Sequence, residues 1–566
     1  MPPKLREKLK HIVIDDFRQG IVSNIRAGAF GGGVLDAQKP GAAQEGTYGC
    51  IANQTGQLVP LPYGQSIGNI TCGSAGVTGV NTVNTCGIAT CGPTVPLSGS
   101  AQFQDDIFII AQYSGVQSGT RHECFQSFVI KPDGSILSIQ IFVGLAQNNV
   151  TPRGVTFANT RSRLSNFNTP GHPVMAWEFT SGEPFQDGAL AQYVLYPNLT
   201  GASIDTPYGE NYTVSNSGSV FGGQLLAHDG RILRLAERSY DFGSNTIFET
   251  NELIRYTDPP GSYQLNTNVT DSILDPQIPG GYGSWGSITF GELLLIKRYG
   301  GALLVMGDVY APQMTRLEGV PGTGALMNKA TACAGGLIYC VSNDGAYIWG
   351  GGSTSEKINL INDQFHTPQI PMAYGRRTDH ILWNNWVVFT NGWLFDPLNN
   401  SWWQIHTNIF QGQGNVQWLA AGKGSTRYLW CIPGSGMASN NDPNIEYVRF
   451  DRFQPSSNYY WISQALPVSI MQTIDIHEVQ LSISKYAANT TLTVQLDTFV
   501  GPSANETITL PNSGDHPFRL RIPMGVRGQS VTIRVWATAP TNQPAPIINE
   551  IAVGYLEAGP YGQSYV

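Results

Sequence analysis

One short phrase recurs between Gly222 and Trp430, and it constrains the fold more than any other feature of the sequence. Each copy reads as an apolar strand, a tight turn and a second strand, and the better copies place Asp-Gly or Asn-Gly in the turn. These pairs supply the positive φ angles that a two-residue β-hairpin requires. The copies lie at 222–235, 300–308, 335–349 and 385–396. Upstream of them, residues 131–139 contain only the turn and the second strand of the phrase. The better copies recur about 35–50 residues apart, which predicts the four-stranded blades of a β-propeller.

The rest of the chain divides around this repeat. Strands and turns alternate from Asp105 to about Pro467, which predicts about five to seven blades. From there to Glu557 the expected strands alternate apolar and polar residues, with Val531, Ile533 and Val535 as one apolar set, so each buries one face as in an antiparallel β-sandwich of the jelly-roll type. We therefore predict an all-β chain with three parts: an extended N-terminal arm over 1–100, a β-propeller-like domain over 101–466 and a C-terminal β-sandwich with a short tail over 467–566.

Residues 1–100 are rich in Gly, Thr and Asn and show little periodicity. Such a segment buries little apolar surface alone, so we expect it to dock on a neighbouring subunit. Within it, residues 5–16 read either as a short amphipathic helix or as a strand.

Charge excludes some functions. The net charge of −8 disfavours a surface that neutralises nucleic-acid phosphates, so no tight nucleic-acid binding is expected. The apolar runs have the length of strands, and the N-terminus lacks the apolar run of a signal peptide, so neither a membrane span nor a leader is predicted.

The cysteines leave three alternatives open. Cys72, Cys86 and Cys91 lie in a loop rich in Gly, Thr and Asn, where free thiols, a disulfide or a metal site are conceivable. Their spacing is not that of a zinc site and no histidine lies nearby, so we predict neither a metal nor a cofactor.

The sequence lacks the usual catalytic motifs. It has no Gly-x-Ser-x-Gly, no His-Glu-x-x-His and no phosphate-binding glycine loop. Residues 342–349 resemble the Asp-box turn of sialidase-type propellers, a structural turn that takes no part in catalysis. We therefore predict no catalytic residues and a protein that is not an enzyme.

Five tryptophans gather within twenty-one residues and have two interpretations. Exposed indole rings stack on the faces of sugars, which predicts a glycan-binding surface. Large rings also fill the space between adjacent blades, which predicts a buried position instead. The five residues are Trp383, Trp386, Trp393, Trp402 and Trp403.

The opening segment resembles a known family. Residues 15–21 (DDFRQGI) are followed by Leu35-Asp36, by residues 42–45 (AAQE) and by residues 53–58 (NQTGQL). This series is similar to the start of tail proteins of the nozzle or hub type in tailed bacteriophages, although Arg-Pro-Gly is replaced here by residues 60–64 (PLPYG).

The resemblance implies a structural role as a minor tail protein of the virion. Copies of the chain would assemble with one another and with other tail proteins in the host bacterial cytoplasm, and could contact a glycan of the host surface. The alternatives are a carbohydrate-binding adhesin or receptor-binding protein, and an enzyme that degrades polysaccharide.

Overall fold

The computed structural model describes residues 9–21, 43, 46–71 and 82–87, the strands between 100 and 357 given below, and residues 380–389, 392–405, 417–420, 427–432, 444–466, 472–498, 503–528 and 531–560. Side chains are described mainly before residue 68 and after residue 382. Every regular element in these ranges is a β-strand, as the all-β prediction requires.

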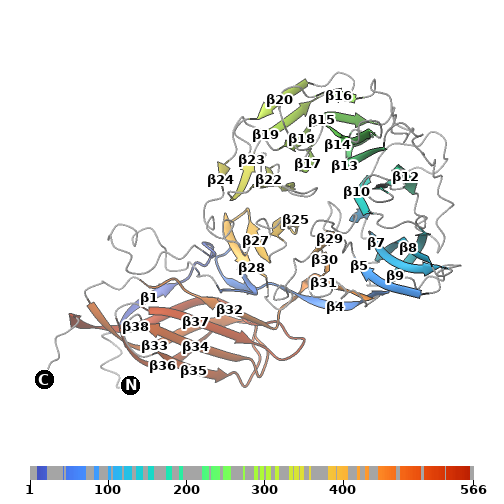
Figure 1. Cartoon of the computed structure of the whole chain (residues 1–566). Helices are drawn as coiled ribbons and strands as arrows, with labels where there is room; N and C mark the ends of the chain where they lie inside the picture. The colour runs from blue at the N-terminus through green and yellow to red at the C-terminus, as the bar shows by residue number, and fades with distance from the viewer. Residues whose placement is uncertain are drawn as a thin grey trace.

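Seven antiparallel sheets follow one another around a ring and are called blades one to seven (Figure 1). Blade one contains β5 (Thr82–Gly87), β6 (Ser100–Phe103), β7 (Asp106–Gln117), β8 (Thr120–Ile130) and β9 (Ile136–Val143). Blade two contains β10 (Thr151–Ala158), β11 (Val174–Thr180) and β12 (Leu190–Leu195). Blade three contains β13 (Ser219–His228), β14 (Arg231–Asp241), β15 (Thr246–Tyr256) and β16 (Ser272–Leu274).

The next three blades each contain four strands in chain order. Blade four contains β17 (Gly286–Phe290), β18 (Leu293–Arg298), β19 (Gly301–Met306) and β20 (Gln313–Leu317). Blade five contains β21 (Thr331–Ala334), β22 (Leu337–Ser342), β23 (Gly345–Trp349) and β24 (Glu356–Lys357). Blade six contains β25 (His380–Trp383), β26 (Trp386–Phe389), β27 (Trp393–Asp396) and β28 (Ser401–Gln404).

The N-terminal segment completes blade seven. Its order is β29 (Gln417–Ala420), β30 (Tyr428–Ile432), β31 (Asn444–Pro455) and β4 (Pro62–Thr71), so the outer strand comes from the start of the chain. The first strands of neighbouring blades touch around the ring, and β29 reaches β6 of blade one. This closed arrangement agrees with the propeller-like body predicted from the repeated phrase.

The repeated phrases fall on successive blades but not on the same strands. The copy at 222–235 covers the first two strands of blade three, whereas the copies at 335–349 and 385–396 cover the second and third strands of blades five and six. In blade six the two-residue turn is Asn384-Asn385, with φ of 52° and 66°, and it precedes the Asn-Gly pair of the phrase. Both angles are positive, as a type I′ hairpin requires.

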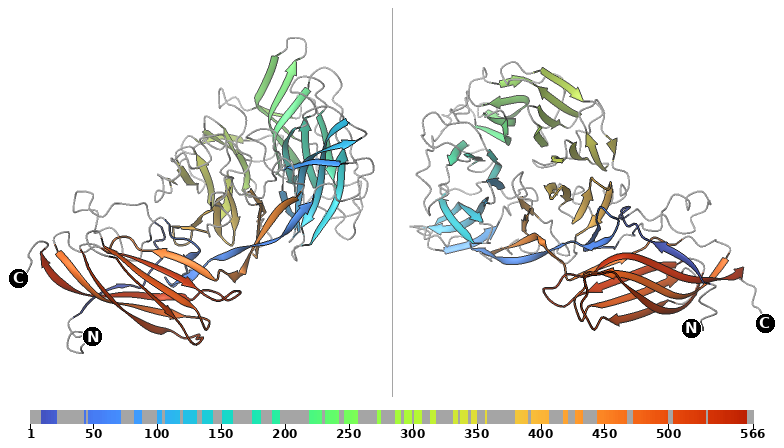
Figure 2. Two further views of the ribbon diagram at one scale, coloured as in Figure 1. Left: turned by 60° about the horizontal axis from the view of Figure 1, so that its bottom comes forward. Right: turned by 180° about the vertical axis from the view of Figure 1, so that it is seen from behind.

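Two further sheets form the C-terminal unit beside the ring (Figure 2). The first sheet contains β1 (Lys10–Ile14), β2 (Cys50–Ala52), β3 (Leu58–Pro60), β33 (Gln472–Ser484), β36 (Phe518–Gly528) and β38 (Ile547–Pro560). The second sheet has the order β32 (Asn458–Ile462), β37 (Val531–Thr538), β34 (Thr491–Thr498) and β35 (Ala504–Thr509). The alternating residues on their inner faces are buried, which fits the predicted sandwich.

The predicted domain boundaries need two corrections. The C-terminal unit begins at β32, before residue 467, because β32 pairs with β37. The described parts of residues 1–71 form no separate arm, because β1 to β4 pair with strands of their own chain. Residues 10–14 are a strand, so the helical alternative is wrong.

The N-terminal segment packs on its own chain because it contains apolar side chains that become part of the core. Ile14, Phe17 and Ile21 are buried, and the Phe17 ring lies edge-on against Trp461 at 5.3 Å. Ile21 then donates its backbone N–H to the carbonyl oxygen of Trp402 in blade six, at 2.8 Å. The segment therefore joins the C-terminal unit to blades six and seven.

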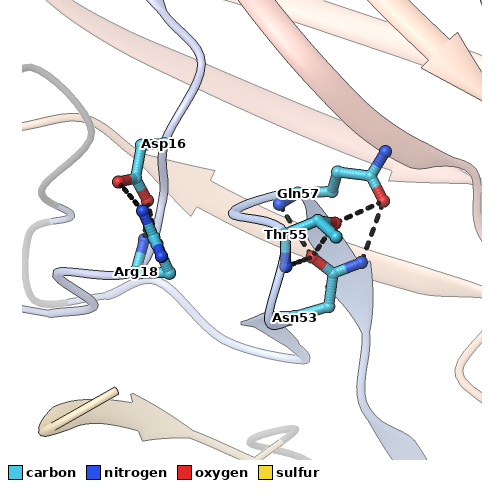
Figure 3. A network of polar contacts seen from close by, with 5 residues as sticks. All are labelled: Asp16, Arg18, Asn53, Thr55 and Gln57. Carbon is cyan, nitrogen blue, oxygen red and sulfur yellow. Dashed lines mark hydrogen bonds and ion pairs between the residues drawn. The ribbon is translucent and has the colours of Figure 1, made fainter.

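Side-chain hydrogen bonds fix the turn between β2 and β3 (Figure 3). The Asn53 Oδ1 atom accepts bonds from the backbone N–H groups of Thr55 and Gln57, at 3.1 and 2.9 Å. Gln57 also donates to Asn549 Oδ1 of β38 at 2.7 Å, and Asp16 pairs locally with Arg18. These residues of the opening segment thus form bonds within the turn and, through Gln57, to β38 of the same chain.

In the part of the chain that the structure describes, no helix has the length and apolar character needed to cross a bilayer.

Candidate functional site

Four of the five clustered tryptophans lie in the interior. Trp402 and Trp403 are 0% exposed and Trp383 is 1% exposed, while Trp393 is also buried. The Trp402 ring packs on Phe395 at 5.0 Å, and Trp403 Nε1 donates to Ser401 Oγ at 2.9 Å. Rings without an exposed face cannot stack on a sugar, so the glycan-binding prediction is corrected for these four residues.

The fifth ring, Trp386, is partly buried and lies edge-on against Trp383 at 5.8 Å. Since its neighbouring tryptophans are buried, Trp386 does not form a sugar-stacking surface with them. The cluster at 383–403 therefore fills the inside of blade six and its border with the N-terminal segment.

A different aromatic row lies on the outer face of the second C-terminal sheet. Tyr460 and Trp536 are cross-strand partners, and their rings stack at 4.6 Å with only 19° between the planes. Tyr48 forms a bridge with Tyr460 and extends the row, with its ring centroid 5.7 Å from that of Tyr460. Tyr48 and Trp536 are both partly exposed.

The strand order decides which residues flank Trp536 on the outer face. Tyr460 covers one face of the indole, and the next residue along the same row, on β34, is Thr493. The neighbour of Trp536 on the side away from Tyr460 is therefore a small polar side chain, and Trp536 is partly exposed. On this side the Oγ1 atoms of Thr493 and Thr507 lie 2.9 Å apart.

One step along the strands, a polar network is held next to the aromatic row. Arg534 Nη1 donates to the Tyr460 hydroxyl at 3.1 Å, and the Arg534 guanidinium pairs with Asp497. Gln495 Nε2 donates to Asp497 Oδ1 at 2.7 Å. Burial raises the pKa of the Tyr460 phenol, so this hydroxyl remains protonated and able to donate. The Gln495 amide oxygen and the remaining Arg534 N–H groups keep hydrogen-bonding capacity.

The rest of this face carries small uncharged polar side chains. Those on β34 and β37 alternate with the buried residues of their strands, as period-two strands require, and those on β35 are cross-strand partners of β34. The partly or fully exposed members are Thr491, Thr493, Asn505, Thr507, Thr509, Thr532 and Thr538. We call the aromatic row, the polar network and these residues the Trp536 face.

Sequence reasoning missed this face although a signal was present. Val531, Ile533 and Val535 were identified as the buried set of their strand, and the alternate positions therefore had to be Thr532, Arg534 and Trp536. A tryptophan on the solvent-facing side of a strand, where polar residues are expected, indicates a surface with a function. Tyr48 and Tyr460 had no such signal, because only tertiary pairing places them beside Trp536.

Among the described residues, no three His, Cys, Asp or Glu side chains come together as a potential metal site. Cys50 is a buried free thiol, and burial raises its pKa well above the ordinary value. Cys72, Cys91 and the side chain of Cys86 lie outside the described residues, so the three alternatives for them stay open.

No protein-family model matches the sequence, and no curated protein matches it. Solved structures that match include an exo-β-1,3-galactanase from Phanerochaete chrysosporium, at 11% identity over 84% of this chain and 99% of that chain, with a TM-score of 0.25. An exo-inulinase from Aspergillus awamori matches at 9% identity over 88% and 99%, with a TM-score of 0.29. A Pyrococcus horikoshii acylaminoacyl peptidase matches at 10% over 65% and 57%, with a TM-score of 0.32.

These matches correct two predictions. The structures named above are enzymes, two of them a galactanase and an inulinase, so we withdraw the prediction of a non-enzymatic structural tail protein. The TM-scores are too low to assign a fold or an activity to this chain. The resemblance of its opening segment, its self-association and its location in a virion stay predictions.

Proposed function

We propose that this protein binds carbohydrate and that the Trp536 face of the C-terminal unit is a binding site. The observation that carries the proposal is the partly exposed indole of Trp536, held by its stack on Tyr460 beside fixed donors and acceptors. Sugars combine flat C–H faces with dense hydroxyl groups, so they need an aromatic platform and neighbouring polar groups together. Binding sites in general combine aromatic surface with a few well-placed polar groups.

The chemistry of the face favours a sugar over a protein partner. Its two charged side chains, Arg534 and Asp497, pair with each other, so the face is close to neutral. Its other outward residues are mostly threonine and amide side chains, whereas the core of a protein–protein interface is more apolar. Hydroxyl and amide groups suit a ligand that is itself covered with hydroxyl groups.

The test is glycan binding by the intact chain and by Trp536→Ala. We expect the substitution to weaken binding to a neutral polysaccharide by about five- to tenfold, because loss of one ring stack removes about 1–1.4 kcal/mol. Gln495→Ala should weaken binding by a smaller factor through loss of a hydrogen bond. Affinity electrophoresis against a panel of soluble polysaccharides and calorimetry on the best ligand would measure both effects.

Phe518→Ala is the matched control, because Phe518 is a 46% exposed aromatic residue on β36 of the other sheet. Equal losses of affinity in Trp536→Ala and Phe518→Ala, or unchanged affinity in Trp536→Ala, would show that the Trp536 face is not the binding site. Thermal unfolding of each variant separates lost binding from lost folding. Release of reducing ends from the bound polysaccharide, measured in parallel, decides whether the chain also cleaves it.

A further inference from the structure

A second group of exposed aromatic and cationic side chains lies at the end of blade seven, where β31 leads into the C-terminal unit. Phe453 is 67% exposed there, although apolar side chains of this size are usually covered. Tyr428, which begins β30, pairs with Asp451 of β31 and is partly exposed. Three arginines complete this group, which we call the Phe453 cluster: Arg427, Arg449 and Arg452.

The guanidinium groups lie against the two rings. The Arg427 Cζ atom is 4.7 Å from the Tyr428 ring centroid and 5.4 Å from that of Phe453. Arg449 approaches the Tyr428 ring at 5.0 Å, and Arg452 approaches the Phe453 ring at 5.8 Å. Cation–π contacts at these distances orient the cations without neutralising them.

A buried carboxylate holds the cluster in place. Asp451 is 3% exposed and accepts two bonds from Arg427, at 3.2 and 3.0 Å, and one from the backbone N–H of Phe453, at 3.0 Å. Burial opposes ionisation of this carboxyl, but the bonds from Arg427 and Phe453 outweigh it and lower its pKa. Asp451 therefore stays charged, and Arg427 and Phe453 are fixed before any ligand arrives.

The cluster brings cationic side chains together in an acidic chain. In the described part of the cluster Asp451 pairs with Arg427, and Arg452 adds a further cation, while the chain as a whole carries a net charge of −8. Arg427 and Arg452 are exposed. Planar guanidinium groups match carboxylate and sulfate oxygens in pairs, and an exposed ring beside them offers an apolar flat surface.

We propose that the Phe453 cluster binds an anionic sugar, a residue that carries a carboxylate or sulfate on its ring. Such a sugar presents the charge for Arg452 and a C–H face for Phe453 within one small unit, whereas an acidic peptide offers the charge without the flat face. This inference rests on the proposed carbohydrate-binding function and adds a second class of sugar, acidic sugars, recognised by the Phe453 cluster.

The experiment compares four probes on the full-length chain: oligogalacturonate, dextran sulfate, neutral dextran and polyglutamate. The variant is Arg452→Gln with Phe453→Ala, which changes two exposed side chains and leaves the Arg427–Asp451 pair intact. We expect about a tenfold or larger loss of affinity for the anionic sugar that binds best, and no change for dextran. The binding should also weaken with added salt.

Arg521→Gln is the matched control, since Arg521 is an exposed arginine on β36 and its replacement changes the net charge in the same way as Arg452→Gln. Equal losses in Arg521→Gln and in the double variant would overturn the proposal, because the net charge alone would then explain binding. Equal affinity for polyglutamate and the anionic sugars would overturn it as well.

Comparison of oligogalacturonate with dextran sulfate identifies the anionic group, and binding of either one supports the site. Trp536→Ala separates the two proposals. Loss of acidic-sugar binding in the double variant but not in Trp536→Ala would support the Phe453 cluster, whereas the Trp536 face is tested by the effect of Trp536→Ala on neutral-polysaccharide binding. Loss of acidic-sugar binding in Trp536→Ala but not in the double variant would reject the Phe453 cluster as the acidic-sugar site.

Discussion

At Gly20 the backbone has a φ of +64°, and a Cβ atom there would lie 2.5 Å from the Trp402 carbonyl oxygen and 2.9 Å from Ser401 Cβ. Both constraints come from the contact between the N-terminal segment and blade six. Only glycine satisfies them without movement of the backbone.

We predict that Gly20→Ala lowers the free energy of unfolding by about 1–3 kcal/mol, because it adds both an unfavourable φ and a steric clash. Denaturant unfolding of the full chain measures this. Gly525→Ala is the control, since a Cβ at Gly525 meets nothing within 4 Å. A similar loss in both variants would show that the Trp402 contact does not constrain residue 20.

Among the elements, the stretch between β1 and β2 depends on one ring. Phe17 is 0% exposed and lies against Trp461 of β32 with an interplanar angle of 86°. We expect Phe17→Ala to cost about 3–5 kcal/mol of unfolding free energy, the range for a large aromatic side chain removed from a core. Val13→Ala, at a position 44% exposed on β1, should cost far less. If the two variants unfold alike, Phe17 is not part of the core that joins this segment to β32.

For the whole molecule, the pairing of β4 with β31 has a consequence for truncation. Removal of residues 1–71 would leave blade seven without its outer strand and β38 without β1 and β3. We predict that such a chain loses cooperative unfolding and aggregates, because unpaired strand edges and core surface become exposed. Light scattering and thermal unfolding measure this. A truncated chain that is monodisperse and fully folded would contradict it and would favour a docking role for the N-terminal segment.

Local patterns predicted the element types well for particular physical reasons. Strict alternation at 492–496 and 531–535 specified strands with one buried face, and the structure buries Leu492, Val494 and Val535 as expected. Asp229-Gly230 marked the two-residue connection between β13 and β14, because the angles of such a turn are set by two residues alone, whereas the two-residue turn of blade six is Asn384-Asn385. The tryptophans at 383–403 were ambiguous, since large rings suit both a core and a sugar-binding surface.

The sequence by itself therefore determined an all-β chain, a repeated-blade body and a final alternating unit, because strand period and turn chemistry are properties of neighbouring residues. Only the tertiary structure decided that the N-terminal segment completes blade seven and the first C-terminal sheet, and that Tyr48, Tyr460 and Trp536 share one face. Those pairings join residues hundreds of positions apart. They are decided by which apolar surfaces bury one another best, and no local pattern along the chain records that choice.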